Sequence, residues 1–141
     1  MKNVTLMSII ALLSMTSCKA QSNEEAAIRE TIAAYTKAGD INDAAKLATY
    51  LDEHYRIVMN QLFGSTEISV MPKNVYLEKI RTKEYGGDNR KIDIISMILN
   101  GNTASAQVIF TGSKMTFASI LTLARDASGA WKILSDMPVI R

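Results

Sequence analysis

The 141-residue sequence has few of the residue types that hold small proteins together by covalent or metal bonds: one Cys, one His and one Trp. A single Cys excludes an internal disulfide, and a zinc site needs several His or Cys ligands. With 7 Gly, 2 Pro and 48% hydrophobic residues, the chain is neither collagen-like nor disordered. A chain of this length can bury about two-thirds of its unfolded surface, so a hydrophobic core alone can stabilise one domain.

Motifs for several common reactions are missing as well. The sequence contains no Gly-rich loop that would cradle a phosphate and no Gly-x-Ser-x-Gly elbow for a nucleophilic serine. Its acidic residues form no loop with the ligand spacing of a calcium site. We therefore expect neither a metal nor a cofactor.

The first 20 residues predict export. A Lys near the start precedes an apolar run, residues 4–15, that is too short to span a bilayer comfortably and is typical of a signal peptide. The run ends at Met15-Thr16-Ser17-Cys18, which resembles a bacterial lipoprotein signal in which Cys18 is lipidated. Cleavage after Ala20 is the alternative. We expect residues 21–141 to form one exported domain, periplasmic or anchored to the outer membrane as a lipoprotein, or otherwise secreted.

The net charge of the predicted mature domain excludes a nucleic-acid binder. The whole chain has 16 basic and 14 acidic residues, and Lys2 and Lys19 both lie in the leader. Removing these two leaves 14 basic residues against 14 acidic ones, so the domain is neutral. A nucleic-acid-binding surface needs an excess of positive charge, which this domain lacks.

The first half of the domain has helical spacing. Apolar residues at i, i+4 and i+7 from Ile28 predict a helix that starts at a capping box at Ser22 and stops at Gly39. A second helix follows over residues 44–51. A third is expected from Pro72 to about residue 84, because proline is well placed in the first turn of a helix.

The second half predicts an antiparallel meander. Turn sequences rich in Asn, Gly, Asp and Ser separate four extended segments, and a further strand is expected over residues 54–63. The four segments are 90–99, 103–111, 114–125 and 130–139.

Two of these strands are apolar on both faces. In residues 91–99, Ile92, Ile94 and Ile98 share one face by simple alternation, and Ile95 shares the other with Met97 and Leu99. Both faces of such a strand need to be covered. The three helices can cover one face, and a second copy of the sheet would cover the other, so we expect a homodimer packed sheet to sheet. An exposed, weakly apolar face is the alternative.

The order of elements resembles a known family. The order is helix, helix, strand, helix and a long antiparallel meander. Short segments spread along the chain also match the family: Gly39-Asp40, Leu62-Phe63-Gly64, residues 117–123 and residues 129–133. Over about residues 23–141 this resembles the nuclear transport factor 2-like superfamily, and most of all its SnoaL-like group and the exported bacterial proteins described as putative lumazine-binding. The resemblance implies an α+β fold, a cystatin-like roll in which a cone-shaped, curved antiparallel sheet wraps around three helices and encloses a pocket.

Members of this superfamily differ in activity. Some are isomerases, dehydratases or cyclases, some bind a ligand without chemistry, and some only mediate association. In the isomerases a carboxylate base lies just before a Phe-Gly pair, but here that stretch reads Asn60-Gln61-Leu62-Phe63-Gly64 and offers an amide, which does not abstract protons. The isomerases also have a tyrosine on the first helix that donates a hydrogen bond to the substrate. In this sequence its position falls on Ile32, and Tyr35 lies about one turn later. Both departures argue against an enzyme.

The remaining acid–base candidate is His54, within Asp52-Glu53-His54. It could act as a base, with Asp136 or Asp52, if its side chain enters the pocket. The alternative is a half-exposed His at a helix–strand junction without any role in chemistry.

The predicted pocket lining consists of large apolar or amphipathic residues from elements expected to face each other, together with one carboxylate. Asp136 lies in a strand otherwise expected to be buried, so it must pair with Arg56 or Arg90, face the dimer rim, or approach a ligand. For the apolar and aromatic residues, and for Trp131, core packing is the alternative. The predicted ligand-binding residues are Tyr35, His54, Met59, Tyr76, Ile80, Met97, Phe117 and Asp136.

These features favour a binding module over an enzyme. The expected function is to hold a small, flat, apolar or heteroaromatic molecule in the cone, without assembled catalytic machinery. One alternative is a small isomerase, dehydratase or cyclase that uses His54. The other is a dimeric interaction module whose cone is filled by its own side chains. Membrane contact is expected only through the lipid anchor.

Overall fold

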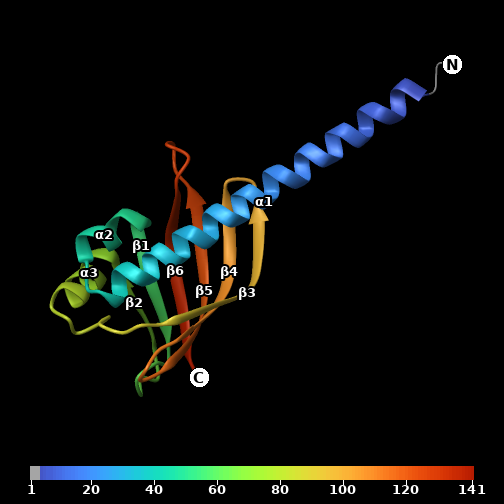
Figure 1. Cartoon of the computed structure of the whole chain (residues 1–141). Coiled ribbons are helices and arrows are strands. Elements are labelled where there is room, and N and C mark those ends of the chain that lie inside the picture. The colour runs from blue at the N-terminus through green and yellow to red at the C-terminus, as the bar shows by residue number, and fades with distance from the viewer. Residues whose placement is uncertain (1–3) are drawn as a thin grey trace.

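The computed structural model describes the backbone of residues 4–141 and the side chains of residues 18–141. The described chain has the expected α+β fold, with helices packed on one sheet (Figure 1). The helices are α1 (Val4–Asp40), α2 (Ala44–Tyr50) and α3 (Lys73–Arg81). The strands are β1 (Leu51–Asn60), β2 (Ile68–Pro72), β3 (Lys91–Asn100), β4 (Thr103–Thr111), β5 (Thr116–Arg125) and β6 (Trp131–Ile140).

The strands form one sheet in the order β2-β1-β6-β5-β4-β3. β3 to β6 pair in chain order as an antiparallel meander, which confirms the four predicted strands. β1 forms an antiparallel hairpin with β2 and lies parallel to β6. This one parallel pair was not part of the expected antiparallel sheet, and it joins the N-terminal half of the chain to the last strand.

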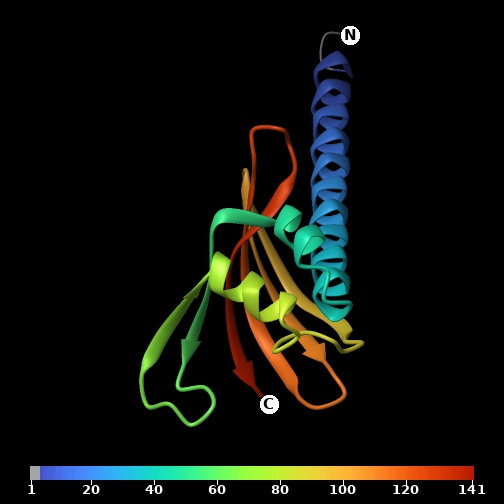
Figure 2. The ribbon, with the colours of Figure 1, turned by 90° about the vertical axis from the view of Figure 1, so that its left-hand side faces the viewer.

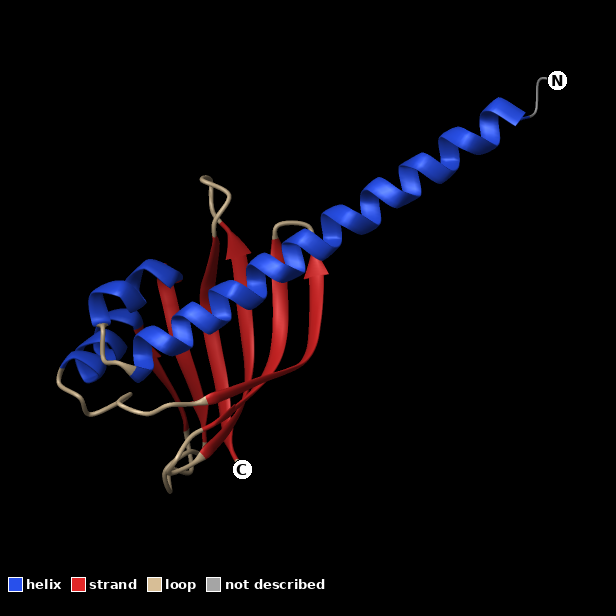
Figure 3. Cartoon of the chain, viewed as in Figure 1, coloured by secondary structure: helices blue, strands red, loops and turns tan. Residues whose placement is uncertain are grey.

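The helices lie on one face of the curved sheet (Figures 2 and 3). α1 contacts β3 and β6, whereas α2 and α3 contact β1 and its neighbours. Their apolar faces and the inner face of the sheet form one hydrophobic core. Burial of this apolar surface provides the main stabilisation of the fold.

α1 begins earlier than the sequence predicts. Ile28, Ile32 and Tyr35 are all buried, which confirms the helical spacing. The predicted start at Ser22 is wrong, because α1 runs without a break from Val4 to Asp40. The first part of α1 extends beyond the sheet (Figure 1). The predicted signal-peptide segment falls mostly on residues whose side chains lie outside the described part of the chain. Within the described part, no helix combines the length and the apolar character that crossing a membrane requires.

The joint between α1 and α2 closes against the end of α3. The side-chain amide of Asn42 donates hydrogen bonds to the carbonyl oxygens of Ile80 (3.0 Å) and Tyr85 (2.7 Å). Gly86 has a φ of +77° and lies so close to the joint that a Cβ there would be 2.2 Å from the carbonyl oxygen of Gly39. Only glycine fits this position without displacing backbone.

A β-bulge in β3 corrects the predicted faces of residues 91–99. Ile94 and Ser96 pair with consecutive residues of β4, which leaves Ile95 unpaired. The extra residue reverses the alternation, so Ile98 lies on the outer face and not with Ile92 and Ile94 as predicted. The residues partly buried against the core are Ile92, Ile94, Met97 and Leu99.

The outer face of the sheet is apolar over several strands. On β5, Leu121 is fully buried and Ile120 is 50% exposed, so both faces of this strand are apolar, as predicted. Exposed apolar side chains of β2, β3, β5 and β6 lie on the same face of the sheet, and we call these residues the outer apolar face. It consists of Ile68, Val70, Ile95, Ile98, Ile120, Met137 and Val139.

Candidate functional site

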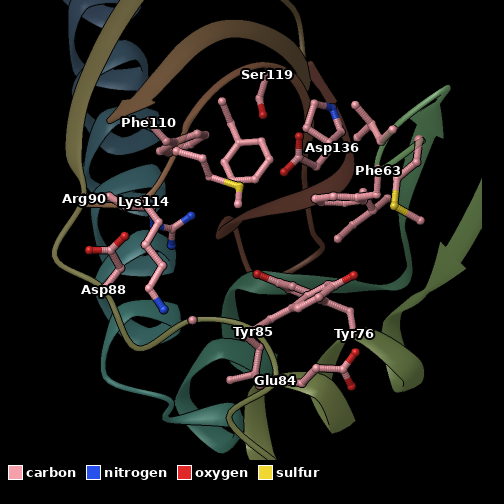
Figure 4. Close-up of a pocket in the computed structure, with 18 of the residues that line it drawn as sticks. Phe63, Tyr76, Glu84, Tyr85, Asp88, Arg90, Phe110, Lys114, Ser119 and Asp136 are labelled. Atoms are coloured by element: carbon pink, nitrogen blue, oxygen red, sulfur yellow. The ribbon is translucent and has the colours of Figure 1, made fainter. Parts of the chain in front are cut away.

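A cavity of about 300 Å³ lies between the inner face of the sheet, α1 and the end of α3 (Figure 4). Aromatic rings line it from several elements: Tyr35 on α1, Tyr76 on α3, Phe110 on β4 and Phe117 on β5. The cone is therefore open and is not filled by its own side chains. A cavity of this size has room for a compact ligand of one or two rings.

Asp136 on β6 is a buried charged group in this cavity, and a β-bulge places it there. Ile133 and Ser135 pair with consecutive residues of β5, which leaves Leu134 unpaired. Simple alternation from the buried Ile133 would turn Asp136 to the outer face of the sheet. The extra residue reverses the alternation, so Asp136 points inward and is 8% exposed.

Two polar atoms in the cavity have no hydrogen-bond partner among the described residues: Oδ1 of Asp136 and Oγ of Ser119. Ser119 lies on β5, where it pairs with Pro138, and Leu121 two residues along pairs with Asp136. The two side chains are thus diagonal neighbours on adjacent strands. Both point into the cavity (Figure 4).

Burial raises the pKa of Asp136 from its ordinary value of 3.8 to about 6. The hydroxyls of Ser119 and Tyr35 and the positive charge of Arg90 are close enough to limit this rise. In this geometry, however, Oδ1 of Asp136 and Oγ of Ser119 make no hydrogen bond that meets ordinary limits of distance and angle. At neutral pH, Asp136 is therefore mainly ionised and still has unused capacity to accept hydrogen bonds.

Three tyrosine hydroxyls meet on the helix side of the cavity. The hydroxyl of Tyr35 lies 3.4 Å from that of Tyr55 and 3.5 Å from that of Tyr76. The rings of Tyr55 and Tyr76 are 5.6 Å apart, centre to centre. Burial raises the pKa of all three hydroxyls above the ordinary value of 10, so each keeps its proton at neutral pH.

Arg90 lines the cavity but does not form an ion pair with Asp136. Its Nε donates to Oδ1 of Asp40 (2.6 Å), and its backbone N–H donates to Oδ2 of the same carboxylate (2.9 Å). One guanidinium nitrogen also donates to the carbonyl oxygen of Thr36 (3.3 Å). The other predicted partner of Asp136, Arg56, is exposed on β1. Neither arginine neutralises Asp136 directly.

Exposed residues surround the mouth of the cavity. Phe63, in the loop between β1 and β2, is 63% exposed, and Lys114 is exposed and makes no ion pair with the described residues. Asp88 accepts hydrogen bonds from the backbone N–H of Ser113 through both carboxylate oxygens (3.2 and 3.0 Å). This contact fixes the β4–β5 turn, and Lys114 with it, beside the segment that precedes β3.

Six of the eight predicted ligand-binding residues line the cavity: Tyr35, Met59, Tyr76, Ile80, Phe117 and Asp136. Their binding of a ligand stays a prediction. His54 is exposed on β1, where its backbone N–H donates to Asp52 (2.8 Å), and it does not reach the cavity. Met97 is partly buried against the core, also outside the cavity.

Several residues at the cavity were not predicted from the sequence. Ser119 carried a usable signal, because it alternates with the apolar residues Phe117 and Leu121 of its own strand. Tyr55, which contacts Tyr35 from behind the lining, carried the same signal through its alternation with Ile57. No local pattern points to Lys114, which reaches the mouth only because Asp88 holds the turn.

The arrangement offers recognition by apolar contact and by a few hydrogen bonds. Asn60 and Gln61, the amides expected from the resemblance at the position of the isomerase base, are both exposed. Among residues 18–141, no group of three His, Cys, Asp or Glu side chains could hold a metal ion. Asp136 is the buried carboxylate of the lining, and Glu84 and Asp88 are lining carboxylates nearer to solvent. The other polar groups are the Ser119 hydroxyl, tyrosine hydroxyls, the Lys114 ammonium at the mouth and the paired guanidinium of Arg90.

The family model described as "Putative lumazine-binding" matches residues 23–137, which include nearly all of the sheet and the helices that enclose the cavity. The chain belongs to this family. No curated protein gives a significant match to this member of the putative lumazine-binding family.

Solved structures similar to this putative lumazine-binding family member share its fold. An "NTF-2 like protein of unknown function" from Silicibacter pomeroyi is 20% identical with a TM-score of 0.74, and the match covers 86% of this chain and 98% of that one. A similar protein from Shewanella baltica is 18% identical, with a TM-score of 0.73 over 85% and 95% of the two chains. A "ketosteroid isomerase-like protein" from Erwinia carotovora atroseptica is 14% identical, with a TM-score of 0.65 over 82% and 94%. These likenesses confirm the nuclear transport factor 2-like fold.

Proposed function

We propose that this protein is exported and binds a small, flat, apolar or heteroaromatic molecule in its cavity. The observation that carries the proposal is the cavity of about 300 Å³, with mainly apolar and aromatic walls and one buried carboxylate. Binding sites for small molecules are usually of this kind, because apolar walls supply affinity and a few polar groups fix the orientation of the ligand. Membership of the putative lumazine-binding family supports the same function.

The first experiment is native mass spectrometry of the protein purified from its own host, followed by titration with lumazine and related bicyclic heteroaromatic compounds. We expect a retained small molecule or a rise in melting temperature with at least one compound. Ser119→Phe should abolish binding, because the new ring would occupy the cavity. Ser96→Phe, which changes an exposed serine on β3, should not. Absence of any retained molecule together with no thermal shift would refute the proposal.

A second candidate function is proton transfer at Asp136. The observation in its favour is a buried carboxyl with a pKa raised to about 6, close to the protonated hydroxyl of Tyr35. A group with a pKa near the working pH can act as an acid or a base. Once a ligand is identified, its turnover by wild type and by Asp136→Asn separates the two functions. A compound that is released unchanged by wild type excludes proton-transfer catalysis on that compound.

We also propose that the protein is a homodimer packed through the outer apolar face. This face is exposed in the single chain and extends over β2, β3, β5 and β6. Several large apolar side chains exposed on one face of a sheet are typical of an interface between proteins.

Finally, we propose that Cys18 carries a lipid that anchors the protein. Cys18 is exposed on α1, six residues before Glu24, where the helix is fixed to the sheet. In the native host, wild type is expected in the membrane fraction, and Cys18→Ser is expected in the soluble fraction. Equal distribution of the two proteins would contradict a lipid anchor at this residue.

A further inference from the structure

Asp136 Oδ1 and Ser119 Oγ are two buried polar atoms that lack a partner among the described residues. Their residues are 8% and 1% exposed, and both side chains point into the cavity from adjacent strands. Buried polar groups in folded proteins nearly always have a hydrogen-bond partner, so an unpaired pair that faces an open cavity needs an explanation.

Among the described residues, no side chain donates a hydrogen bond to Oδ1 of Asp136 or pairs with Oγ of Ser119. Arg90 already donates to Asp40 and to the carbonyl oxygen of Thr36. The hydroxyl of Tyr35 faces those of Tyr55 and Tyr76. Lys114 is exposed at the mouth, and Arg56 is exposed on β1. Both atoms face the open cavity, where a bound molecule can supply the missing partners.

The chemistry of the two atoms defines the edge of that molecule. An ionised carboxylate can only accept hydrogen bonds, whereas a serine hydroxyl can donate one. Their complement is an N–H donor next to a carbonyl acceptor, which is the edge of a cyclic amide. A cationic ligand would satisfy Asp136 but would offer no carbonyl acceptor to the Ser119 hydroxyl.

We propose that Asp136 and Ser119 together select ligands with a cyclic amide edge, and that Asp136 is the residue that determines specificity. The N–H of the ligand donates to Oδ1 of Asp136, and its carbonyl oxygen accepts from Oγ of Ser119. The flat body of the ligand then lies against the aromatic walls, which include Phe110 and Phe117. This inference rests on the proposed binding function and adds the class of ligand to it.

Three probes of nearly equal size and shape test the proposal. Quinolin-2(1H)-one has the N–H and the carbonyl, coumarin replaces the N–H by a ring oxygen, and naphthalene has neither. We expect wild type to bind quinolin-2(1H)-one about tenfold or more tighter than coumarin in calorimetric titration, because a hydrogen bond to a charged group is lost.

Two variants separate the roles of the two residues. Asp136→Leu is apolar and keeps the branched shape of the aspartate side chain, so it should bind quinolin-2(1H)-one and coumarin equally and still bind naphthalene. Ser119→Ala should weaken both carbonyl-bearing probes about two- to tenfold relative to naphthalene and preserve the ratio between them. Ser96→Ala, at an exposed position on β3, serves as the control and should bind all three probes as wild type does.

The outcomes distinguish this inference from the proposed function on which it rests. Equal binding of all three probes by wild type would overturn the cyclic amide preference and leave small-molecule binding intact. A preference for quinolin-2(1H)-one that persists in Asp136→Leu would overturn the role of Asp136. Failure of wild type to bind any probe would overturn the binding function and this inference with it.

Discussion

Asp136 brings a negative charge into the interior without an ion pair to any described residue. Its pKa in the folded protein is about 6, above the ordinary value of 3.8, so the folded state holds this proton more strongly than the unfolded state does. The contribution of Asp136 to stability is therefore greatest at low pH and is lost as the pH rises from about 4 to about 6. Such a cost is common where a group is kept for binding or catalysis.

Asp136→Asn should stabilise the protein at neutral pH. We expect the free energy of unfolding to rise by about 2–3 kcal/mol at pH 7.5, because the buried charge is removed, and to change little at pH 4. Urea denaturation at a series of pH values measures this difference. If Asp136→Asn instead loses stability at pH 7.5 and not at pH 4, the ionised carboxylate has hydrogen-bond or charge partners in the folded protein, and the prediction is wrong.

The Arg90–Asp40 pair should behave in the opposite way, because its partners satisfy each other. Asp40→Ala leaves the guanidinium partly buried and removes one hydrogen bond from Nε and one from the backbone N–H of Arg90, so we expect a loss of about 3 kcal/mol. Asp93→Ala is the control, since Asp93 forms an exposed pair with Lys91 whose loss should cost less than about 1 kcal/mol. Denaturant midpoints of the two variants that differ by less than the error of measurement would contradict the assigned role of Asp40.

At the scale of elements, α1 is fixed to the sheet near the middle of its length. Oε2 of Glu24 accepts a hydrogen bond from the indole N–H of Trp131 (2.8 Å), and Oε1 pairs with Arg125 (2.9 Å). These contacts join the helix to the β5–β6 hairpin. They explain why Glu24 lies in the middle of a helix and not in the capping box that the sequence suggested.

Glu24→Ala should loosen this attachment. We expect a loss of about 1–2 kcal/mol, since a charged hydrogen bond and a partly exposed ion pair are removed together. Trp131 is the only tryptophan in the chain, so its emission should shift to longer wavelength as the indole gains contact with water. Glu30→Ala, an exposed position on the same helix, provides the comparison. Identical spectra and midpoints for both variants would rule out this attachment.

At the scale of the whole molecule, the helices cover the inner face of the sheet and leave the outer apolar face exposed (Figure 2). Ile120 and Met137 are paired residues of adjacent strands on this face, and both are about half exposed. Burying such a surface against a second copy would remove it from water at a gain of roughly 25 cal/mol per Å².

Ile120→Asp should prevent this pairing. A charge at the centre of an apolar interface is strongly unfavourable, so we expect the variant to be monomeric under conditions in which wild type is dimeric. Sedimentation equilibrium measures the mass directly. Ile41→Asp adds the same charge at an exposed position in the α1–α2 joint and should not alter the mass. A monomeric wild type would refute the dimer.

The two β-bulges show where prediction from the sequence stops. Alternation and turn sequences predicted the four strands of the meander, because both are local properties of a hairpin. Alternation alone assigned Ile98 to the wrong face of β3, since nothing in residues 91–99 marks Ile95 as the unpaired residue. The same holds for the bulge in β6, because pairing with β5 decides that Leu134 is the residue without a partner.

The cavity was predicted in part for the same reason. Tyr35 and Tyr76 follow from helical spacing, whereas His54 was considered for its chemistry alone and lies on the exposed side of β1. The contact between Arg90 and Asp40 joins residues 50 positions apart, and no local pattern specifies it. Long-range pairs of this kind appear only when the elements are packed.

The sequence by itself determined the α+β class, the order of the elements and the family resemblance. Hydrophobic spacing and turn residues, on which these depend, are properties of short segments that can be recognised without the fold. The tertiary structure alone decided that Asp136 and Ser119 face one cavity, where Oδ1 and Oγ have no partner among the described residues. It did so through a single extra residue in β6, and the position of that residue depends on pairing with a strand formed elsewhere in the chain.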